Sequence, residues 1–220
     1  MIAHPDISIS TNDCWAKRHE PDCPGAQPEV PAMIHIEQAA NRAKDPICSI
    51  CIANYNGEHM LQDCLDSVFA QGWEGEVEVI VHVGFCVANN RMAAHARGKF
   101  LLLLNNDAAL FPDALSTLMA IAKEHPRGAV LTLPQYDWAS GRLVDRGCLL
   151  DPFYNPVPNT DPQRSRVAMA IGACLWIGRE YWETLGGFPE WLGSIAEDMY
   201  LCCAARQRGL PVIAARTSGY

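Results

Sequence analysis

The sequence has no cluster of basic residues and no long apolar run. Its 220 residues include 17 Lys and Arg against 25 Asp and Glu, which gives a formal net charge of -8. This balance excludes a broad nucleic-acid surface, because neutralising phosphates needs a clustered excess of Lys and Arg. The apolar stretch at residues 167–178 is too short to cross a bilayer and is interrupted by Gly172. We therefore expect no transmembrane segment and no nucleic-acid partner.

A sustained apolar segment of the kind found in signal peptides is also missing, and Asp6 and Asp13 interrupt the start of the chain. We therefore expect a cytoplasmic protein, and a membrane-peripheral location is compatible with that. The ten cysteines are scattered through apolar segments, which predicts buried thiols rather than a disulfide framework. Cys48 and Cys51 have C-x-x-C spacing, but no second pair follows, and residues three apart on a strand face opposite sides.

The sequence changes in character near residue 45. Before it, five prolines interrupt a polar sequence, so residues 1–45 are expected to form a partly irregular leader or linker, in which 33–44 can form one helix. After it, strand and helix patterns alternate, with strands expected at 47–53, 77–81, 100–104 and 211–215 and helices at 60–70, 87–97, 112–124 and 196–207. This alternation predicts an α/β domain over 46–220, with a mostly parallel sheet covered by helices on both faces.

Polar residues follow the apolar strand at residues 101–104, which consists of four leucines. Asn105, Asn106 and Asp107 come directly after it. In an α/β protein, such a strand places its polar end in the crevice at the carboxyl edge of the sheet. Asp107 and Asn105 are candidate ligands for Mg²⁺ or Mn²⁺, because these ions prefer oxygen ligands and take one or two carboxylates. The alternative is an Asx turn in which the side chains bond their own backbone.

Two further segments carry candidate site residues. Asn54, Tyr55 and Asn56 precede Gly57, and this composition favours a turn that can expose the Tyr55 ring for stacking on a nucleobase. On its own, the same segment would be an ordinary turn.

Glu197 and Asp198 begin the helix expected at 196–207, after a loop at 186–191 that is rich in glycine and aromatic residues. The helix dipole alone explains acidic residues in a first turn. A general base, however, also needs an ionised carboxylate that faces the crevice.

Taken in order, these motifs resemble the family 2 glycosyltransferases with the GT-A fold. Residues 49–57 are similar to that family's opening strand and nucleotide-contacting loop, and 83–90 to a helix entry. Residues 102–107 resemble its DxD-type metal motif, in the Asn-containing form of rhamnosyltransferase-like and galactofuranosyltransferase-like members. Segments 172–175, 186–188 and 197–198 resemble its acceptor-side strand, loop and base motif. The resemblance extends over residues 47–209.

This resemblance implies an inverting, metal-dependent hexosyl- or deoxyhexosyltransferase. It would move a sugar from a nucleotide-diphosphate donor to a hydroxyl of a glycan, lipid or protein. Asp107 and Asn105 would hold Mn²⁺ or Mg²⁺, and Asp198, with Glu197, would deprotonate the acceptor. The implied nucleotide-binding residues are Asn54, Tyr55, Asn56, Asn90 and Asn106.

The sequence departs from the family pattern in three places. First, residues 77–81 are followed by His82 and then directly by 83–85. The family has an Asp-containing loop here, followed by a helix and a strand, and this sequence lacks all three. The segment was deleted naturally, deleted by engineering or left out of this sequence. The chain ends at Tyr220 without a His after Asp198, which suggests truncation at the C-terminus. Tyr200 replaces a family acid, and no Gln-x-x-Arg-Trp motif follows, which disfavours a processive synthase.

Two other classes of function remain as alternatives. One is a non-catalytic glycosyltransferase-like domain that binds nucleotide or glycan, or serves as an interaction module, having lost the donor loop. The other is a nucleotidyltransferase on a related fold, which needs a basic, Gly-rich phosphate loop near the first strand. Residues 53–58 contain no basic residue, which disfavours this second class.

Overall fold

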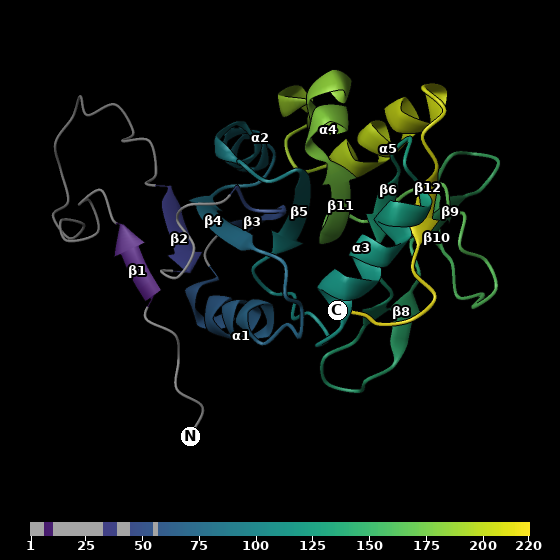
Figure 1. The fold of residues 1–220 in the computed structure, drawn as a ribbon. Helices are drawn as coiled ribbons and strands as arrows, with labels where there is room; N and C mark the ends of the chain where they lie inside the picture. The colour runs from purple at the N-terminus through teal and green to yellow at the C-terminus, as the bar shows by residue number, and fades with distance from the viewer. Residues whose placement is uncertain (1–6, 11–32, 39–44, 55–56) are drawn as a thin grey trace, which may run out of the picture.

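In the computed structural model of the chain, which describes residues 7–10, 33–38, 45–54 and 57–220, strands and helices alternate from β3 onward (Figure 1). The central sheet contains β1 (Ile7–Ser10), β2 (Ile34–Gln38), β3 (Cys48–Asn54), β4 (Val77–Val83), β5 (Phe100–Asn105), β6 (Val130–Thr132), β11 (Cys174–Gly178) and β12 (Val212–Ala214). The helices are α1 (Glu58–Phe69), α2 (Cys86–His95), α3 (Ala114–Glu124), α4 (Arg179–Leu185), α5 (Glu197–Gln207) and the 3-10 helix η1 (Glu190–Leu192). Two small sheets pair β7 (Gln135–Tyr136) with β8 (Leu143–Asp145) and β9 (Cys148–Leu150) with β10 (Pro156–Pro158).

The central sheet has the strand order β1-β2-β4-β3-β5-β11-β6-β12. β3 pairs in parallel with β4 and β5, and β6 pairs in parallel with β12. β11 is antiparallel to both β5 and β6, so the direction reverses twice and β3, β4, β5, β6 and β12 all run the same way. The expected α/β sheet with mostly parallel strands is therefore confirmed, and the carboxyl ends of these five strands meet at one edge.

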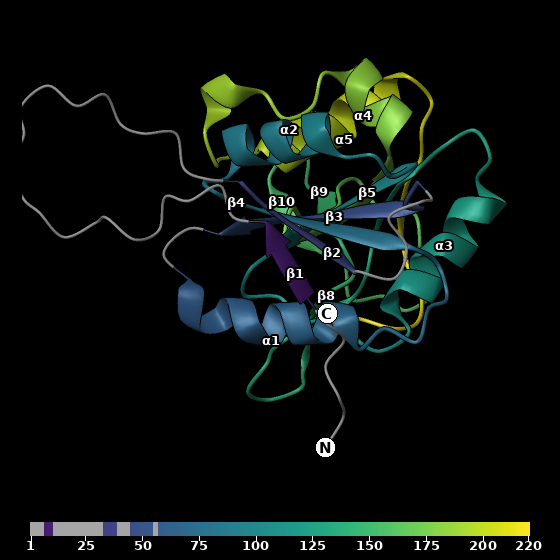
Figure 2. The same ribbon diagram turned by 60° about the vertical axis from the view of Figure 1, so that its left-hand side comes forward.

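Helices cover both faces of the sheet (Figure 2): α2, α4 and α5 lie on one side, and α1 and α3 on the other. The four leucines of β5 are fully buried, because they pack alternately into the two cores. Burying each such side chain stabilises the fold by about 1.5–3 kcal/mol. Cys48 and Cys51 also pack into opposite cores as free thiols, as expected. No helix within the described ranges is long and apolar enough to span a membrane.

A helix was expected over residues 33–44, and this prediction is wrong for the part that the structure describes, because Ile34–Gln38 form the strand β2. β2 pairs antiparallel with β4, with Ile34 opposite Val81 and Ile36 opposite Val79. This pairing satisfies the backbone groups that β4 would otherwise expose, which explains why tertiary context overrides helical propensity. β1 pairs in turn with β2, so two segments from residues 1–45 join the sheet. Residues 39–44 lie outside the described part of the chain.

The connection after β4 is short. Only Gly84 and Phe85 separate β4 from α2, and Gly84 adopts a φ of 117°, which favours glycine. The Gly84 N–H donates a hydrogen bond of 3.3 Å to the Asn54 carbonyl at the end of β3. The chain therefore passes from β4 into α2 without an intervening strand, and β2 takes the place beside β4.

An ion pair between the buried Glu78 and the exposed Arg97 joins the start of β4 to the segment before β5. Glu78 accepts hydrogen bonds from Ser49 Oγ at 2.5 Å, from the Arg97 N–H at 2.6 Å and from Arg97 Nε at 3.0 Å. Ser49 Oγ also accepts a hydrogen bond of 2.8 Å from the Gly98 N–H. Burial alone would raise the pKa of Glu78, but the bonds from Ser49 and Arg97 outweigh it and lower the pKa. The Glu78 carboxylate, with its hydrogen bonds from Ser49 and Arg97, thus links the strands at the amino edge of the sheet.

Candidate functional site

Two asparagines tie the ends of β3 and β5 together. Asn106 Nδ2 donates hydrogen bonds to Asn54 Oδ1 at 2.9 Å and to the Gly57 carbonyl at 3.1 Å. The Gly57 N–H donates to the same Asn54 oxygen at 3.3 Å. A Cβ atom at Gly57 would clash with Asn106 Nδ2, so this position requires glycine. The three residues therefore form a fixed floor at the carboxyl edge of the sheet.

Tyr55 and Asn56 lie outside the described residues, so their roles in nucleotide binding stay predictions. The residues on either side of them, Asn54 and Gly57, are both bonded to the Asn106 amide. The structure thus places the start and the end of the expected nucleotide loop next to the first residues after β5.

Asn105 and Asp107 differ from Asn106, because their side chains have no hydrogen-bond partner in the part of the chain that the structure describes. The Asn105 backbone is fixed: its N–H donates to the Ala173 carbonyl at 3.0 Å, and its own carbonyl accepts a bond from the Ala108 N–H at 3.2 Å. Asp107 is exposed, and neither its carboxylate nor the Asn105 amide bonds to another described residue. Both groups are therefore available to a ligand.

These residues fit a divalent cation that is bound together with its substrate. Among the described residues, no three His, Cys, Asp or Glu side chains gather as a metal site. A free carboxylate at Asp107 beside the Asn105 amide nevertheless matches the way Mg²⁺ and Mn²⁺ are held, by one or two carboxylates, water and phosphate oxygens. The arrangement predicts weak metal binding alone and stronger binding with a diphosphate.

Asp198 lies at the same edge, although ninety residues separate it from β5. Its Oδ2 accepts a hydrogen bond of 3.0 Å from the Gly172 N–H, and its Oδ1 accepts one of 2.7 Å from the Met199 N–H. Gly172 directly precedes Ala173, whose carbonyl bonds the Asn105 N–H. Because β11 runs antiparallel to β5, its first residues meet the last residues of β5. The structure therefore brings the Asn105 segment and the Asp198 segment together.

Glu197 and Asp198 are neighbours in the sequence but differ in environment. The Glu197 side chain is only 4% exposed, and its Oε2 is buried without a hydrogen-bond partner among the described residues. Burial raises the pKa of Glu197, and the neighbouring charge of Asp198 raises it further. Asp198, in contrast, is half-buried and held by two backbone N–H groups. Adjacent carboxylates in such different surroundings can take different chemical roles.

Asn90, which was expected to contact the nucleotide, bonds to the loop after α4. Its Nδ2 donates to the Phe188 carbonyl at 2.8 Å, and its Oδ1 accepts from the Phe188 N–H at 2.9 Å. Phe85 stacks on the Phe188 ring with centroids 6.2 Å apart. Gly187, at a φ of 68°, passes so close that a Cβ would lie 2.5 Å from Asn90 Oδ1. The start of α2 thus fixes this loop, and the nucleotide role of Asn90 stays a prediction.

Another contact at the site, between Cys86 and Gly193, was not predicted from the sequence. The Cys86 thiol donates to the Gly193 carbonyl across 107 positions of sequence. Burial raises the pKa of Cys86 to about 12, and the carboxylates of Glu197, Asp198 and Glu190 raise it as well. The thiol is therefore a neutral donor that ties the η1 loop to α2. Only the structure reveals it, because no motif spans the two positions.

An exposed aromatic pair joins η1 to the first turns of α5. The Trp191 and Tyr200 rings meet edge to face with centroids 6.3 Å apart, and they are 78% and 48% exposed. Tyr200 lies two residues after Asp198 on α5, and its N–H bonds the Ala196 carbonyl at 2.9 Å. These two rings, here called the aromatic rim, form an exposed apolar surface near the start of α5.

The strand order and the likeness to solved structures identify the GT-A fold of nucleotide-diphospho-sugar transferases. The model of the family described as glycosyl transferase family 2 matches residues 81–186 of the chain. This match begins in β4 and ends just after α4, so it includes Asn90, Asn105 and Asp107 but not Asp198. No curated protein matches the chain in sequence.

Solved structures of S. aureus TarS share the fold. TarS 1-349 has 20% sequence identity and a TM-score of 0.58, and the match covers 78% of this chain and 59% of that one. Its complex with UDP-GlcNAc matches with the same identity and TM-score, over 79% of this chain and 58% of that one. The match to the longer TarS structure covers 36% of its length. At this identity, the likeness establishes the fold.

Proposed function

We propose that this domain is a family 2 glycosyltransferase that moves a sugar from a nucleotide-diphosphate donor to an acceptor hydroxyl, with inversion at the sugar carbon. One observation carries the proposal: Asn105 bonds Ala173, and the adjacent Gly172 bonds Asp198. The segment proposed to hold the diphosphate and the carboxylate proposed to take the proton are therefore joined at the same edge of the sheet.

On the donor side, we assign Asp107 and Asn105 to the cation and Asn54, Tyr55, Asn56, Asn90 and Asn106 to the nucleotide. Mn²⁺ or Mg²⁺ would supply charge neutralisation of the departing diphosphate. The free, exposed carboxylate of Asp107 supports this assignment. So does the binding of UDP and UDP-GlcNAc by TarS 1-349 in its structures, which favours a nucleotide-diphosphate donor.

On the acceptor side, Asp198 removes the hydroxyl proton as the acceptor oxygen attacks the sugar carbon. The bond from that carbon to the diphosphate oxygen breaks in the same displacement, so the pair of electrons leaves with the diphosphate. Hydrogen bonds from two backbone N–H groups orient the Asp198 carboxylate for this role. Glu197 lies behind it, and its unpaired buried oxygen offers an acceptor for a bound hydroxyl or water.

The aromatic rim supports a sugar ring as part of the acceptor. Flat exposed rings such as Trp191 and Tyr200 bury the apolar faces of sugars at low conformational cost. We therefore favour a glycan among the acceptor classes of glycan, lipid and protein. We also propose that the donor sugar is a hexose or deoxyhexose. Residues 105–107 support this, because they resemble the motif of rhamnosyltransferase-like and galactofuranosyltransferase-like members. A cytoplasmic, membrane-peripheral location belongs to it as well. We place the start of the glycosyltransferase domain at residue 46, and β1 and β2 extend the edge of its sheet.

The second candidate is a non-catalytic domain that binds nucleotide or glycan. The direct passage from β4 into α2 favours this candidate, because it removes the loop that supplies a nucleotide-contacting carboxylate in the family. The two candidates differ in turnover and in the effect of replacing Asp198.

Thermal shifts with UDP, dTDP, GDP and CMP, each with Mn²⁺, Mg²⁺ or EDTA, test donor binding, since a ligand of the native state raises its stability. We expect one nucleotide to raise the melting temperature only when metal is present. Release of that nucleotide from the matching nucleotide sugar then tests turnover. Metal-dependent binding without any turnover would support the non-catalytic alternative. Absence of binding by every nucleotide would contradict the transferase and favour the non-catalytic domain.

A further inference from the structure

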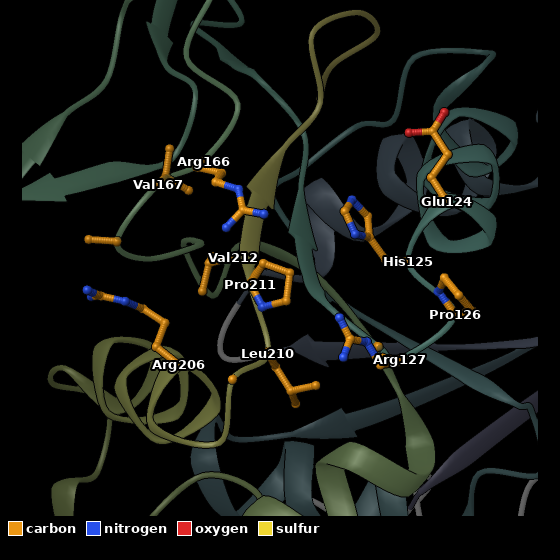
Figure 3. A pocket seen from close by; sticks show the side chains of 13 residues that line it. Glu124, His125, Pro126, Arg127, Arg166, Val167, Arg206, Leu210, Pro211 and Val212 are labelled. Atoms are coloured by element: carbon orange, nitrogen blue, oxygen red, sulfur yellow. The ribbon is translucent and has the colours of Figure 1, made fainter.

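A second pocket lies at the opposite edge of the sheet, with a volume of about 740 Å³ (Figure 3). It is lined by the end of α3 and the turn after it, by residues 166–168, by the end of α5 and by the start of β12. β6 and β12 run parallel to β5, so their first residues are at the amino edge, whereas the proposed donor site is at the carboxyl edge. The 11 residues of α5 span about 16 Å between Glu197 and this pocket. The two sites are therefore separate.

The charges of this pocket are mostly positive and unpaired. Arg127, Arg166 and Arg206 line it, and Glu124 is the only acid that does so. None of the three guanidinium groups has a hydrogen bond or ion pair with a described residue. Figure 3 shows Arg127, Arg166 and the His125 ring around Pro211, with Arg206 on the α5 side and Glu124 farther out. Three free cations thus share one concave surface on a chain with a net charge of -8.

Rigid backbone elements hold these arginines in place. Arg166 lies opposite Ile213 in a short antiparallel bridge, which the Val167 N–H to Val212 carbonyl bond of 3.1 Å extends. Arg206 is in the last turn of α5, which Gly209 ends at a φ of 80°. The helix dipole favours a cation at that turn, but it does not explain the other two arginines, which lie outside helices.

A turn at the end of α3 positions Arg127. Gly128 adopts a φ of 83°, and its N–H bonds the His125 carbonyl at 2.8 Å. The Val130 N–H then bonds the Pro211 carbonyl at 3.0 Å, which joins this turn to the start of β12. The three arginines therefore come from three different segments that the sheet brings together.

We propose that this pocket binds the phosphoryl group of a phosphorylated ligand, at a site distinct from the donor site. Guanidinium groups match the oxygens of phosphate with paired hydrogen bonds, and three of them compensate its double charge. Apolar side chains at Leu210, Pro211 and Val212 form the floor and strengthen such bonds by excluding water. The ligand is either a soluble phosphate compound or a lipid phosphate headgroup, which share this chemistry. The proposal does not depend on glycosyl transfer.

Calorimetric titration with inorganic pyrophosphate, at low ionic strength and with EDTA present, tests the pocket directly. We expect the wild-type chain to bind, and the double variant Arg166→Ala with Arg206→Ala to bind about tenfold more weakly or worse, since each bond to a charged group is substantial. Arg208→Ala is the matched control, because Arg208 is an exposed arginine near the end of α5 that does not line the pocket. Asp107→Ala controls for binding at the donor site, and we expect no loss of affinity from it.

Sedimentation with vesicles of phosphatidic acid in phosphatidylcholine separates the two sources. Co-sedimentation that the double variant loses would identify a lipid headgroup, whereas pyrophosphate binding without co-sedimentation would identify a soluble ligand; both outcomes support the pocket. The proposal is overturned if the wild type binds neither probe, or if Arg208→Ala weakens binding as much as the double variant does. All three lining arginines are exposed, so Arg127→Ala offers a second measurement if the double variant unfolds.

Discussion

The two ends of α5 differ in charge and in how their charges are satisfied. At its first turn, Asp198 bonds the Gly172 N–H, and Asn54 and Asn106 bond each other at the same edge of the sheet. At its last turn, Arg206 faces a pocket in which three arginines have no partner among the described residues. The carboxyl edge is thus preorganised by its own hydrogen bonds, whereas the arginine pocket needs a ligand to complete it.

The amino edge itself contains both arrangements. Beneath β3 and β4, Arg97 pairs with buried Glu78 at 3.0 Å, and Ser49 completes the bonds. Beneath β6 and β12, by contrast, Glu124 lies on the rim of the pocket and bonds none of the three arginines. Arg97 therefore shows that an arginine at this edge can pair with a carboxylate of the same chain. Arg127, Arg166 and Arg206 have no such pair among the described residues, which supports a binding role for them.

The largest expected effect is at the first turn of α5. Asp198→Asn removes the proposed base but keeps the shape of the side chain, so turnover should fall by about 10²–10⁴-fold. Nucleotide binding by thermal shift should not change. Asp63→Asn, an exposed carboxylate on α1, is the control and should retain activity. Full turnover by Asp198→Asn would remove Asp198 as the base.

The next effect tests whether the carboxyl edge depends on metal. Asp107→Ala removes the free carboxylate after β5, so nucleotide affinity measured with Mn²⁺ should fall by about tenfold or more, to the value measured with EDTA. Calorimetric titration of both proteins, with and without EDTA, checks this. An Asp107→Ala protein that still binds more tightly with Mn²⁺ than with EDTA would place the cation elsewhere.

The satisfied charge of the amino edge can be tested through stability. Glu78→Gln should lower the free energy of unfolding by about 1.5–3 kcal/mol at neutral pH, because it weakens charge-assisted bonds from Ser49 and Arg97. The pKa of Glu78 is lowered in the folded state, so its contribution is present above the ordinary value of 4.5 and is lost as pH falls through the folded pKa. Urea denaturation at neutral and acid pH checks both points. Glu74→Gln, at an exposed position, is the control.

Glu197 should show the opposite pH dependence. Its pKa is raised in the folded state, so ionisation opposes folding as pH rises through the ordinary value toward the folded one. Glu197→Gln should therefore stabilise the domain by about 1 kcal/mol at neutral pH, because it removes a buried charge. The difference from wild type should disappear at a pH below 4.5. An equal difference at both pH values would contradict the assigned cause.

The smallest effect is expected at the aromatic rim. Trp191→Ala removes an exposed ring that packs only against the edge of Tyr200, so stability should change little. The KM for a glycan acceptor should rise about fivefold, as expected for the loss of one stacking contact of roughly 1 kcal/mol. Steady-state kinetics with varied acceptor checks this, and Trp138→Ala, an exposed tryptophan after β7, is the matched control. An unchanged KM would remove the rim from the acceptor site.

Local patterns predicted most of the elements correctly. The four leucines before Asn105 form β5, and helices appear where the helical periodicity indicated α1, α2 and α3. The same patterns failed at Ile34–Gln38, which form β2 because β4 offers backbone groups to pair with. Periodicity describes one segment at a time, whereas strand pairing depends on a distant segment.

Only those features of the candidate site that depend on neighbours in the sequence could be predicted. The positions of Asn105, Asp107 and Asp198 after a strand or in a first turn were visible in the sequence, as was the order of these motifs. The sequence did not reveal that Asn90 bonds the Phe188 backbone or that the Cys86 thiol bonds Gly193, because those contacts join segments about 100 positions apart.

The sequence by itself determined the alternation of strands and helices, the polar ends of β3 and β5 and the acidic start of α5, because each follows from neighbours in the chain. Only the tertiary structure decided that Glu197 is buried while Asp198 is half-buried, and that three separate arginines line one pocket. Burial and the proximity of distant charges depend on how the helices pack on the sheet, and no local pattern records that packing.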